Sequence, residues 1–341
     1  MRKTKEKIAA IVLIILVILL SLVSIINGAV NINIHQVAEA INHSFKGIEL
    51  TDLNERIFMQ IRLPKVIMSN VVGASLAVGG VLMQSLFRNP IVEPGLVGTS
   101  SGAAFGAALY FVLGAGFNIN LGEWTLPFAA CIGSMASTAL VFYLSPSRHG
   151  KNSMVSLLLT GIAINTLFLS GVGFLSYISR DPQARSITFW NLGSLSGSYW
   201  EAVYIVSAVT IVCLVISVRY AKQLNALMLG EQEAQLLGVN IKKLRLKVLA
   251  VNVIMIAVAT SFVGVIGFVG LIVPHLLRMV LGSDNRMLTW SAALLGAALL
   301  TASDLVSRTI LAPAELPIGI VTSIIGVPVF IILIRRSNYI F

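Results

Sequence analysis

The sequence predicts an all-α polytopic membrane protein with ten transmembrane helices and both termini in the cytoplasm. The first observation is composition, because 57% of the 341 residues are hydrophobic and only 11% are charged, against about 25% in a soluble domain. The second is a mean hydropathy of +0.90. The third is a series of ten long apolar runs. So few polar residues cannot cover a soluble surface, which excludes a cytosolic enzyme, a disordered protein and a disulfide-stapled secreted domain.

The apolar runs match the hydrocarbon core of a bilayer, which is about 30 Å thick and takes roughly 20 helical residues. The first run, residues 8–26, follows four basic residues. It is longer than the roughly 7–15 apolar residues of a signal peptide, and Asn27-Gly28 follows it, so we expect a retained helix. The further runs cover residues 66–87, 95–116, 126–144, 154–177, 202–219, 247–266, 268–282, 288–306 and 317–334.

The runs 247–266 and 268–282 are nearly continuous, so a single bent helix and nine spans is the alternative. Charge favours two helices. With ten spans, 17 of the 24 lysines and arginines lie on the side that holds both termini, and 7 lie on the other side. That asymmetry is the one expected of cytoplasmic loops. Nine spans would move Arg335 and Arg336 to the outside and weaken it. We therefore expect one transmembrane domain over residues 1–341.

The formal net charge of +10 does not indicate a nucleic-acid partner. Most basic residues flank apolar runs, and no soluble module carries a basic face or zinc-ligand spacing. Cys131 and Cys213 both lie inside apolar runs, so we expect them to pack among helices rather than to form a disulfide or a metal site.

The expected spans lack the groups that ion-driven transport or catalysis usually needs. Almost no charged residue lies mid-span, and Asp304 is near the outer end of its run, which argues against a proton relay. Sodium sites can be built from carbonyls, so an ion-coupled secondary transporter remains an alternative. No Ser/His/Asp set, His-Glu-x-x-His motif or phosphate-binding loop occurs. We therefore expect no enzyme activity and no cofactor, with any ATP hydrolysis on another chain.

The longest cytoplasmic segment covers residues 221–245 and is expected to divide at Gly230 into two short amphipathic pieces. Leu224 and Leu227 lie on the apolar stripe of the first piece, and Ala234 and Leu237 lie on that of the second. One interpretation is an interfacial helix pair on the membrane surface. The other is a docking element for a cytoplasmic partner.

Five stretches in order along the chain resemble the permease subunits of bacterial ABC importers for iron-siderophore complexes, haem and vitamin B12, the FecCD type. They are residues 60–65 (QIRLPK), 87–98 (FRNPIVEPGLVG), 227–238 (LMLGEQEAQLLG), 267–275 (GFVGLIVPH) and 314–319 (AELPIG).

The resemblance implies ten helices per subunit in a bacterial cytoplasmic (inner) membrane. It also implies a second permease subunit, two cytoplasmic ATP-binding subunits and an extracytoplasmic substrate-binding protein. A homodimer of permeases is expected, and a paralogous partner is the alternative.

The resemblance assigns the segment 221–245 to coupling with the ATPase. The matching positions are Leu224, Leu227, Leu229, Gly230, Glu231, Ala234, Leu237 and Gly238. It assigns Arg62, Lys65 and Arg308 to docking of the binding protein. The alternative for these three is anchoring to lipid headgroups or a local ion pair, such as Arg308 with Asp304.

Substrate identity is addressed only by the outer segment 179–194. This segment resembles the haem-type members of the family from Arg185 to Trp190. Arg180 and Arg185 are candidates to meet anionic groups, and Phe189 and Trp190 to stack on a flat ligand, although interfacial anchoring explains the two aromatic residues equally well. As the transported substrate, we expect haem first, a ferric siderophore second and cobalamin third.

Overall fold

The computed structural model describes residues 2–28, 32–48, 52–114, 122–145 and 154–336, and all regular structure within these ranges is helical. The elements in order are α1 (Arg2–Ile26), α2 (Ile34–Lys46), α3 (Leu53–Ile57), η1 (Phe58–Arg62), α4 (Leu63–Phe87), η2 (Pro94–Val97), α5 (Thr99–Leu109), η3 (Tyr110–Gly114), η4 (Gly122–Trp124), α7 (Thr125–Leu144), α8 (Met154–Ile178), α9 (Asp181–Asn191), α10 (Trp200–Leu229), α11 (Glu231–Leu236), α12 (Ile241–Val263), α13 (Val269–Leu281), α14 (Asn285–Thr309) and α15 (Ile318–Arg336).

Seven helical stretches of the described chain are long and apolar enough to cross a membrane. They contain α1, α4, α7, α8, α10, α12 and α14. Three shorter apolar helices, Thr99–Gly114, Val269–Leu281 and Ile318–Leu333, fall on the remaining expected runs. The prediction of an all-α polytopic membrane protein is therefore confirmed. The count of ten crossings and the side of the termini stay predictions.

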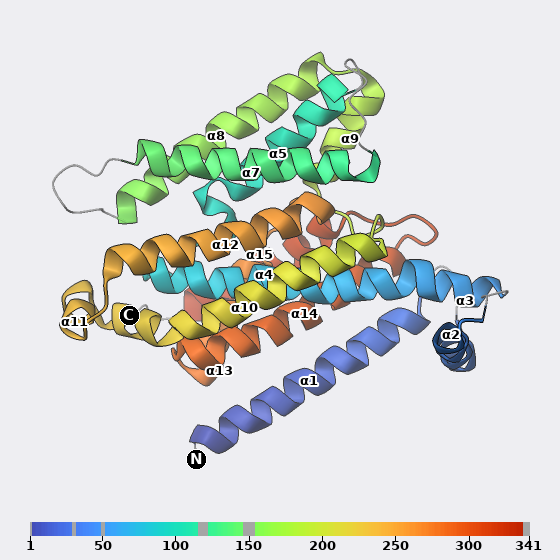
Figure 1. The fold of residues 1–341 in the computed structure, drawn as a ribbon, viewed down its shortest axis with the longest axis horizontal. Helices are drawn as coiled ribbons and strands as arrows, with labels where there is room; N and C mark the ends of the chain where they lie inside the picture. The colour runs from blue at the N-terminus through green and yellow to red at the C-terminus, as the bar shows by residue number, and fades with distance from the viewer. Residues whose placement is uncertain (1, 29–31, 49–51, 115–121, 146–153, 337–341) are drawn as a thin grey trace.

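The helices form two groups (Figure 1). In that view α5, α7, α8 and α9 lie together along one side, and α4, α10, α12, α13, α14 and α15 make up the centre of the molecule. α1 lies against the opposite side, where it packs on α14. The start of α1 is at the same end of the molecule as α11, and α2, α3 and α9 lie toward the other end.

α4 is the central helix, and most of its side chains are buried. Its closest neighbour is α14, because the two helices cross where each carries a glycine. A Cβ added at Gly73 would collide with the carbonyl of Gly296, and one added at Gly296 would collide with the carbonyl of Gly73. α5 and α7 approach each other in the same way at Gly102 and Gly133. Small residues permit this backbone contact between membrane helices.

α12 and α13 are separate helices, as the two-helix interpretation of residues 247–282 requires. α12 ends at Gly264, where φ is +75°, and α13 begins after Phe268, where φ is +69°. Left-handed backbone at both positions cannot continue a right-handed helix. The five residues between the two helices form a break inside the helical bundle.

Candidate functional sites

Residues 221–245 divide at Gly230, as predicted. The prediction of a separate short piece before Gly230 was wrong, because these residues continue a long helix. α10 continues without interruption to Leu229, since no glycine or proline occurs between Arg219 and Gly230. The chain then turns at Gly230, where φ is +147°, and forms the short helix α11. Residues 241–245 already belong to α12. We call residues 229–240, between α10 and α12, the elbow.

Three of the predicted coupling residues are internal supports of the elbow. Leu224 and Leu227 are 1% exposed and Ala234 is fully buried. They join the same core cluster as Ile241 and Leu244 at the start of α12. These side chains therefore fix the angle of the elbow and do not face a partner.

Other elbow residues are exposed. Leu229 is 70% exposed, Leu237 is 64% exposed, and Gly238 and Glu231 are also at the surface. Glu231 forms an ion pair with Arg245 across the turn. Sequence analysis missed Leu236, which is 88% exposed. The hydrophobic pattern had no means of separating an apolar side chain that packs inside from one that points out.

The three predicted docking residues, Arg62, Lys65 and Arg308, lie together around a cavity of about 240 Å³. None of them is more than 7% exposed. The guanidinium of Arg62 donates to the carbonyl of Ile25 at 2.8 Å, and that of Arg308 donates to the carbonyl of Asn27 at 2.8 Å. Two of the three cations are thus engaged with the end of α1.

Carboxylates occupy the rest of this cluster. Arg308 Nε donates to Asp304 Oδ2 at 3.1 Å, which is the local pair named above as the alternative. Lys65 Nζ lies 2.8 Å from both carboxylate oxygens of Glu315 and 3.5 Å from Asp304. The Glu315 side chain is 39% exposed, whereas that of Asp304 is 3% exposed. The Lys65–Glu315 pair is therefore the part of the cluster nearest to solvent.

A larger cavity of about 480 Å³ lies between η2, α5, α8, the end of α9 and the break after α12. Its polar lining comes from Glu93, Ser100, Ser101, Asn165 and Asn191. Asn165 Nδ2 donates to the carbonyl of Leu96 at 3.1 Å, and Ser101 donates its hydroxyl to Asn165 Oδ1. The cavity thus presents the carboxyl group of Glu93 together with amides and hydroxyls in an otherwise apolar wall.

Glu93 joins the two sides of this cavity. Its Oε1 accepts a hydrogen bond from the backbone N–H of Phe268 at 3.1 Å, which ties η2 to the break between α12 and α13. Burial raises the pKa of the Glu93 carboxyl, and the Phe268 N–H partly offsets that effect.

The predicted pathway residues lie on or just before α9, and none of the four lines the 480 Å³ cavity. The Arg185 guanidinium lies over the Phe189 ring at 5.4 Å, and both side chains are exposed. Arg180 precedes the first turn of α9, and Trp190 packs against residues of α5 and α7. Sequence analysis missed the cavity-lining polar residues, because single serines and asparagines in apolar runs carry no motif.

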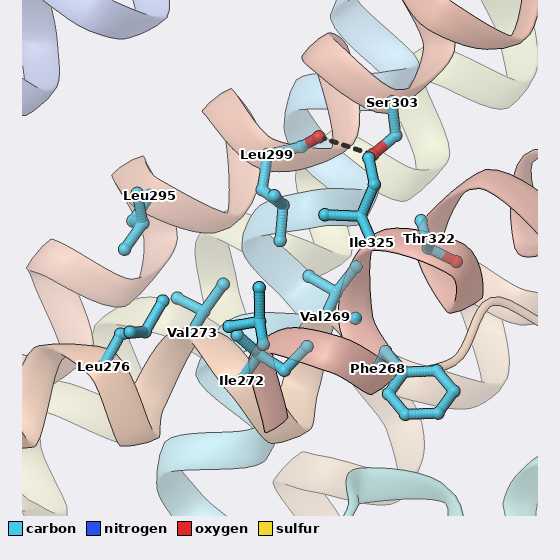
Figure 2. A pocket seen from close by; sticks show the side chains of 12 residues that line it. Phe268, Val269, Ile272, Val273, Leu276, Leu295, Leu299, Ser303, Thr322 and Ile325 are labelled. Carbon is cyan, nitrogen blue, oxygen red and sulfur yellow. Dashed lines mark hydrogen bonds between the residues drawn. The ribbon is translucent and has the colours of Figure 1, made fainter. Parts of the chain in front are cut away.

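A third cavity, of about 100 Å³, lies between α13, α14 and α15 (Figure 2). Its lining is apolar apart from Ser303 and Thr322. Ser303 donates its hydroxyl to the carbonyl of Leu299 in its own helix at 2.9 Å. The hydroxyl of Thr322 likewise donates within its own helix, to the carbonyl of Gly319 at 3.2 Å, so neither polar group of the lining is directed at a guest.

Comparisons with known proteins agree with this architecture. The model of the FecCD transport family matches residues 13–336. The chain is 43% identical over 302 residues to the hemin transport system permease protein HmuU of Yersinia pestis, covering 88% of this chain and 90% of that protein. It is 39% identical over 275 residues to the cobalamin import system permease protein BtuC of Halobacterium salinarum, covering 81% and 72%.

A solved structure of an ABC transporter assigned to the metal-chelate type, in an inward-facing conformation, superposes with a TM-score of 0.84 at 32% identity. The superposition covers 96% of this chain and 99% of the chain in that structure.

The long apolar helices define a multi-pass integral membrane protein. The family match then makes the assignment specific: the chain belongs to the FecCD transport family, the permease subunits of ABC importers. Such permeases have no ATPase activity of their own and work with separate ATPase subunits and a binding protein.

Proposed function

We propose that this permease moves an iron-containing chelate, haem first, from an extracytoplasmic binding protein into the cytoplasm of a bacterium. The observation that supports haem as the substrate is the 43% identity to the hemin permease over nearly the full length of that protein. A ferric siderophore is the second candidate. Cobalamin is the third, and the 39% identity to a cobalamin permease supports it. ATP hydrolysed on two partner subunits would drive the transport.

The elbow is the proposed contact with the ATPase. Leu229, Leu236 and Leu237 present three exposed apolar side chains on a short turn, and the buried core of a protein interface is rich in apolar surface. Leu224, Leu227 and Ala234 hold the turn in shape from inside. Because α10 is one continuous helix, a push on the elbow would act on its whole length.

Docking of the binding protein is proposed at the cation cluster, with Lys65 as its accessible member. A carboxylate on the partner would replace Glu315 on Lys65, while Arg62 and Arg308 keep the end of α1 in place. Contacts of this type contribute more to association rate and orientation than to affinity. Lys65 supplies a point charge, so we expect no bidentate pairing there.

The 480 Å³ cavity is the proposed part of the substrate pathway within one subunit. Its amides and hydroxyls would donate hydrogen bonds to the propionate or carboxylate groups of a chelate. These donors are uncharged, so they hold a carboxylate less strongly than an arginine or lysine would, which suits a cargo that has to be released. Arg185 with Phe189 is proposed as an outer contact before the cavity.

A second permease copy would enclose this pathway. α8 lines the cavity and also exposes large apolar side chains, among them Leu159, Leu167 and Phe174. That surface has to meet either lipid or protein. We propose a homodimer, and a paralogous partner subunit is the alternative.

The test of substrate is uptake in a strain deleted for this gene and complemented with it. Iron is supplied as haem or as ferric siderophores, and cobalamin is measured separately. Loss of haem uptake alone supports the first candidate. Loss of siderophore or cobalamin uptake alone contradicts haem and keeps the transport class. Uptake that persists after inactivation of the partner ATPase would instead favour an ion-coupled transporter.

A further inference from the structure

A cluster of polar groups lies directly behind the elbow, where α10 meets the other central helices. Its members come from α4, α10, α13, the residue before α14 and the first residue of α14. We call these residues the node, and they are Ser85, Asn225, Met228, Arg278, Asp284 and Asn285.

Asn225 connects α10 to the start of α14 through three hydrogen bonds. Its Oδ1 accepts from the backbone N–H of Asn285 at 2.8 Å and from Asn285 Nδ2 at 2.9 Å. Its Nδ2 donates to Asp284 Oδ1 at 2.9 Å. Asp284 is also the N-cap of α14, because the same carboxylate oxygen accepts from the N–H of Arg286. One side chain of α10 thus holds the first turn of α14.

Ser85 extends the node to α4 and α13. Its hydroxyl donates to Asn285 Oδ1, and it accepts from Arg278 Nη2 at 2.8 Å. Met228, one turn after Asn225 on α10, accepts through its sulfur from Asn285 Nδ2 at 3.4 Å and from Arg278 Nη1 at 3.6 Å. Four helices therefore meet through directional contacts at one place.

The surroundings make these contacts rigid. Ser85 and Asn285 are fully buried, and Asn225 is one helical turn from the elbow. Apolar packing is non-directional, so helices joined only by leucines and valines can slide past one another. Hydrogen bonds in a low-dielectric interior have a preferred geometry, and breaking them leaves buried polar groups without partners. Helices joined by the node have to move together.

We propose that the node transmits displacement of the elbow from α10 to α4 and α14, with Asn225 and Ser85 as positioning residues. This inference rests on the proposed coupling function of the elbow. It adds that ATP-driven movement reaches the far end of α14 through these hydrogen bonds. Removing one of the hydrogen bonds should weaken this movement while the ATPase still binds to the permease.

The experiment uses the full complex, purified through a tag on this chain together with its ATPase. A bimane fluorophore is placed on an Ile310→Cys variant in a Cys131→Ser, Cys213→Ser background. Position 310 follows the last turn of α14 and is 62% exposed. The fluorescence change on addition of ATP and vanadate is measured per copurified ATPase. We expect Ser85→Ala and Asn225→Ala to reduce it about threefold.

Asn70→Ala is the matched control. Asn70 also joins helices through its side-chain amide, donating to Ser21 in α1 at 3.0 Å and accepting from Thr301 in α14 at 3.1 Å, but it lies outside the node. We expect its response to equal that of the unsubstituted chain.

Four results would overturn the proposal: an unchanged response in both node variants, an equal loss in Asn70→Ala, no response in the unsubstituted complex, or failure of both node variants to assemble. Each would show that the node does not transmit the movement or only supports folding. Absence of a copurifying ATPase from the unsubstituted chain is a different result, because it would contradict the proposed function itself.

Discussion

Arg308 joins α14 to the end of α1, which Arg62 also contacts. Its guanidinium donates to the carbonyl of Asn27, to Ser24 and to the carboxylate of Asp304. Removing one partner from a buried charge cluster is costly, because the remaining charge keeps its desolvation penalty. At this position the side chain that the sequence indicates as a docking contact also supports the fold.

Replacing this cation should therefore destabilise the protein. We expect Arg308→Met to lower stability by about 3 kcal/mol, measured as a fall in melting temperature in detergent. Arg185→Met is the control, since the exposed guanidinium of Arg185 lies over the ring of Phe189 and its removal should cost about 0.5–1 kcal/mol. Equal melting temperatures for the two variants would mean that Arg308 is not a structural tether.

Glu93 should make stability depend on pH. Its folded-state pKa lies above the ordinary value of 4.5 because of burial. The contribution of Glu93 to stability is therefore present below the pKa that this residue has in the unfolded chain. It is lost as the pH rises through the raised pKa of the folded state. We expect the melting temperature of the native chain to fall, relative to that of Glu93→Gln, over a titration that starts at about pH 4 and rises through the raised pKa.

The Glu93→Gln variant keeps an acceptor for the N–H of Phe268. The exposed Glu201→Gln is the control and should follow the native pH profile. A constant difference in melting temperature between native and Glu93→Gln proteins across this range would contradict the assignment.

At the scale of elements, the contact between α4 and α14 depends on two glycines. We expect Gly73→Ala to lower stability by about 1–3 kcal/mol, because the new methyl group meets the backbone of Gly296 and the helices have to separate. Gly173→Ala, in α8, is the matched control. Its Cβ meets nothing within 4 Å, so it should be neutral or raise stability by about 0.5–1 kcal/mol. Similar melting temperatures for both would contradict the close crossing.

The elbow gives a prediction about assembly. We expect Leu236→Glu to reduce the ATPase that copurifies with this chain about tenfold, since the substitution removes apolar surface and buries a carboxylate without a partner in the interface. The side chain is 88% exposed, so the fold should be unaffected. Leu53→Glu, equally apolar and 68% exposed in α3, is the control. Copurification unchanged by Leu236→Glu would remove the elbow from the interface.

Sequence analysis located the apolar helices, since a membrane span has a length and composition that few other elements share. It also separated α12 from α13 by charge. It did not predict that α10 would run unbroken to Leu229, because the apolar run ends at Arg219 and the amphipathic residues after it suggest a separate short helix. It identified Arg62, Lys65 and Arg308 as a group, but their burial depends on the end of α1, which no local pattern records.

At the scale of the whole molecule, the proposed sites lie at different positions along the same helices. The elbow ends α10, the cation cluster lies toward the other end of α4 and α14, and the 480 Å³ cavity lies between the two helix groups. α4 contacts α10, α12, α13 and α14, so it is placed to respond to movement of any of them. This arrangement suits a transporter in which ATP hydrolysis at the elbow end of the helices opens and closes the substrate pathway.

The most direct test of this account is ATP-dependent accumulation of iron-labelled haem by the purified complex in proteoliposomes that also contain its binding protein. We predict accumulation with ATP and none with a non-hydrolysable analogue. We also predict loss of accumulation when Leu236→Glu is introduced into this chain. Accumulation driven by an ion gradient without ATP, or ATP-driven accumulation of a different chelate in preference to haem, would contradict the account.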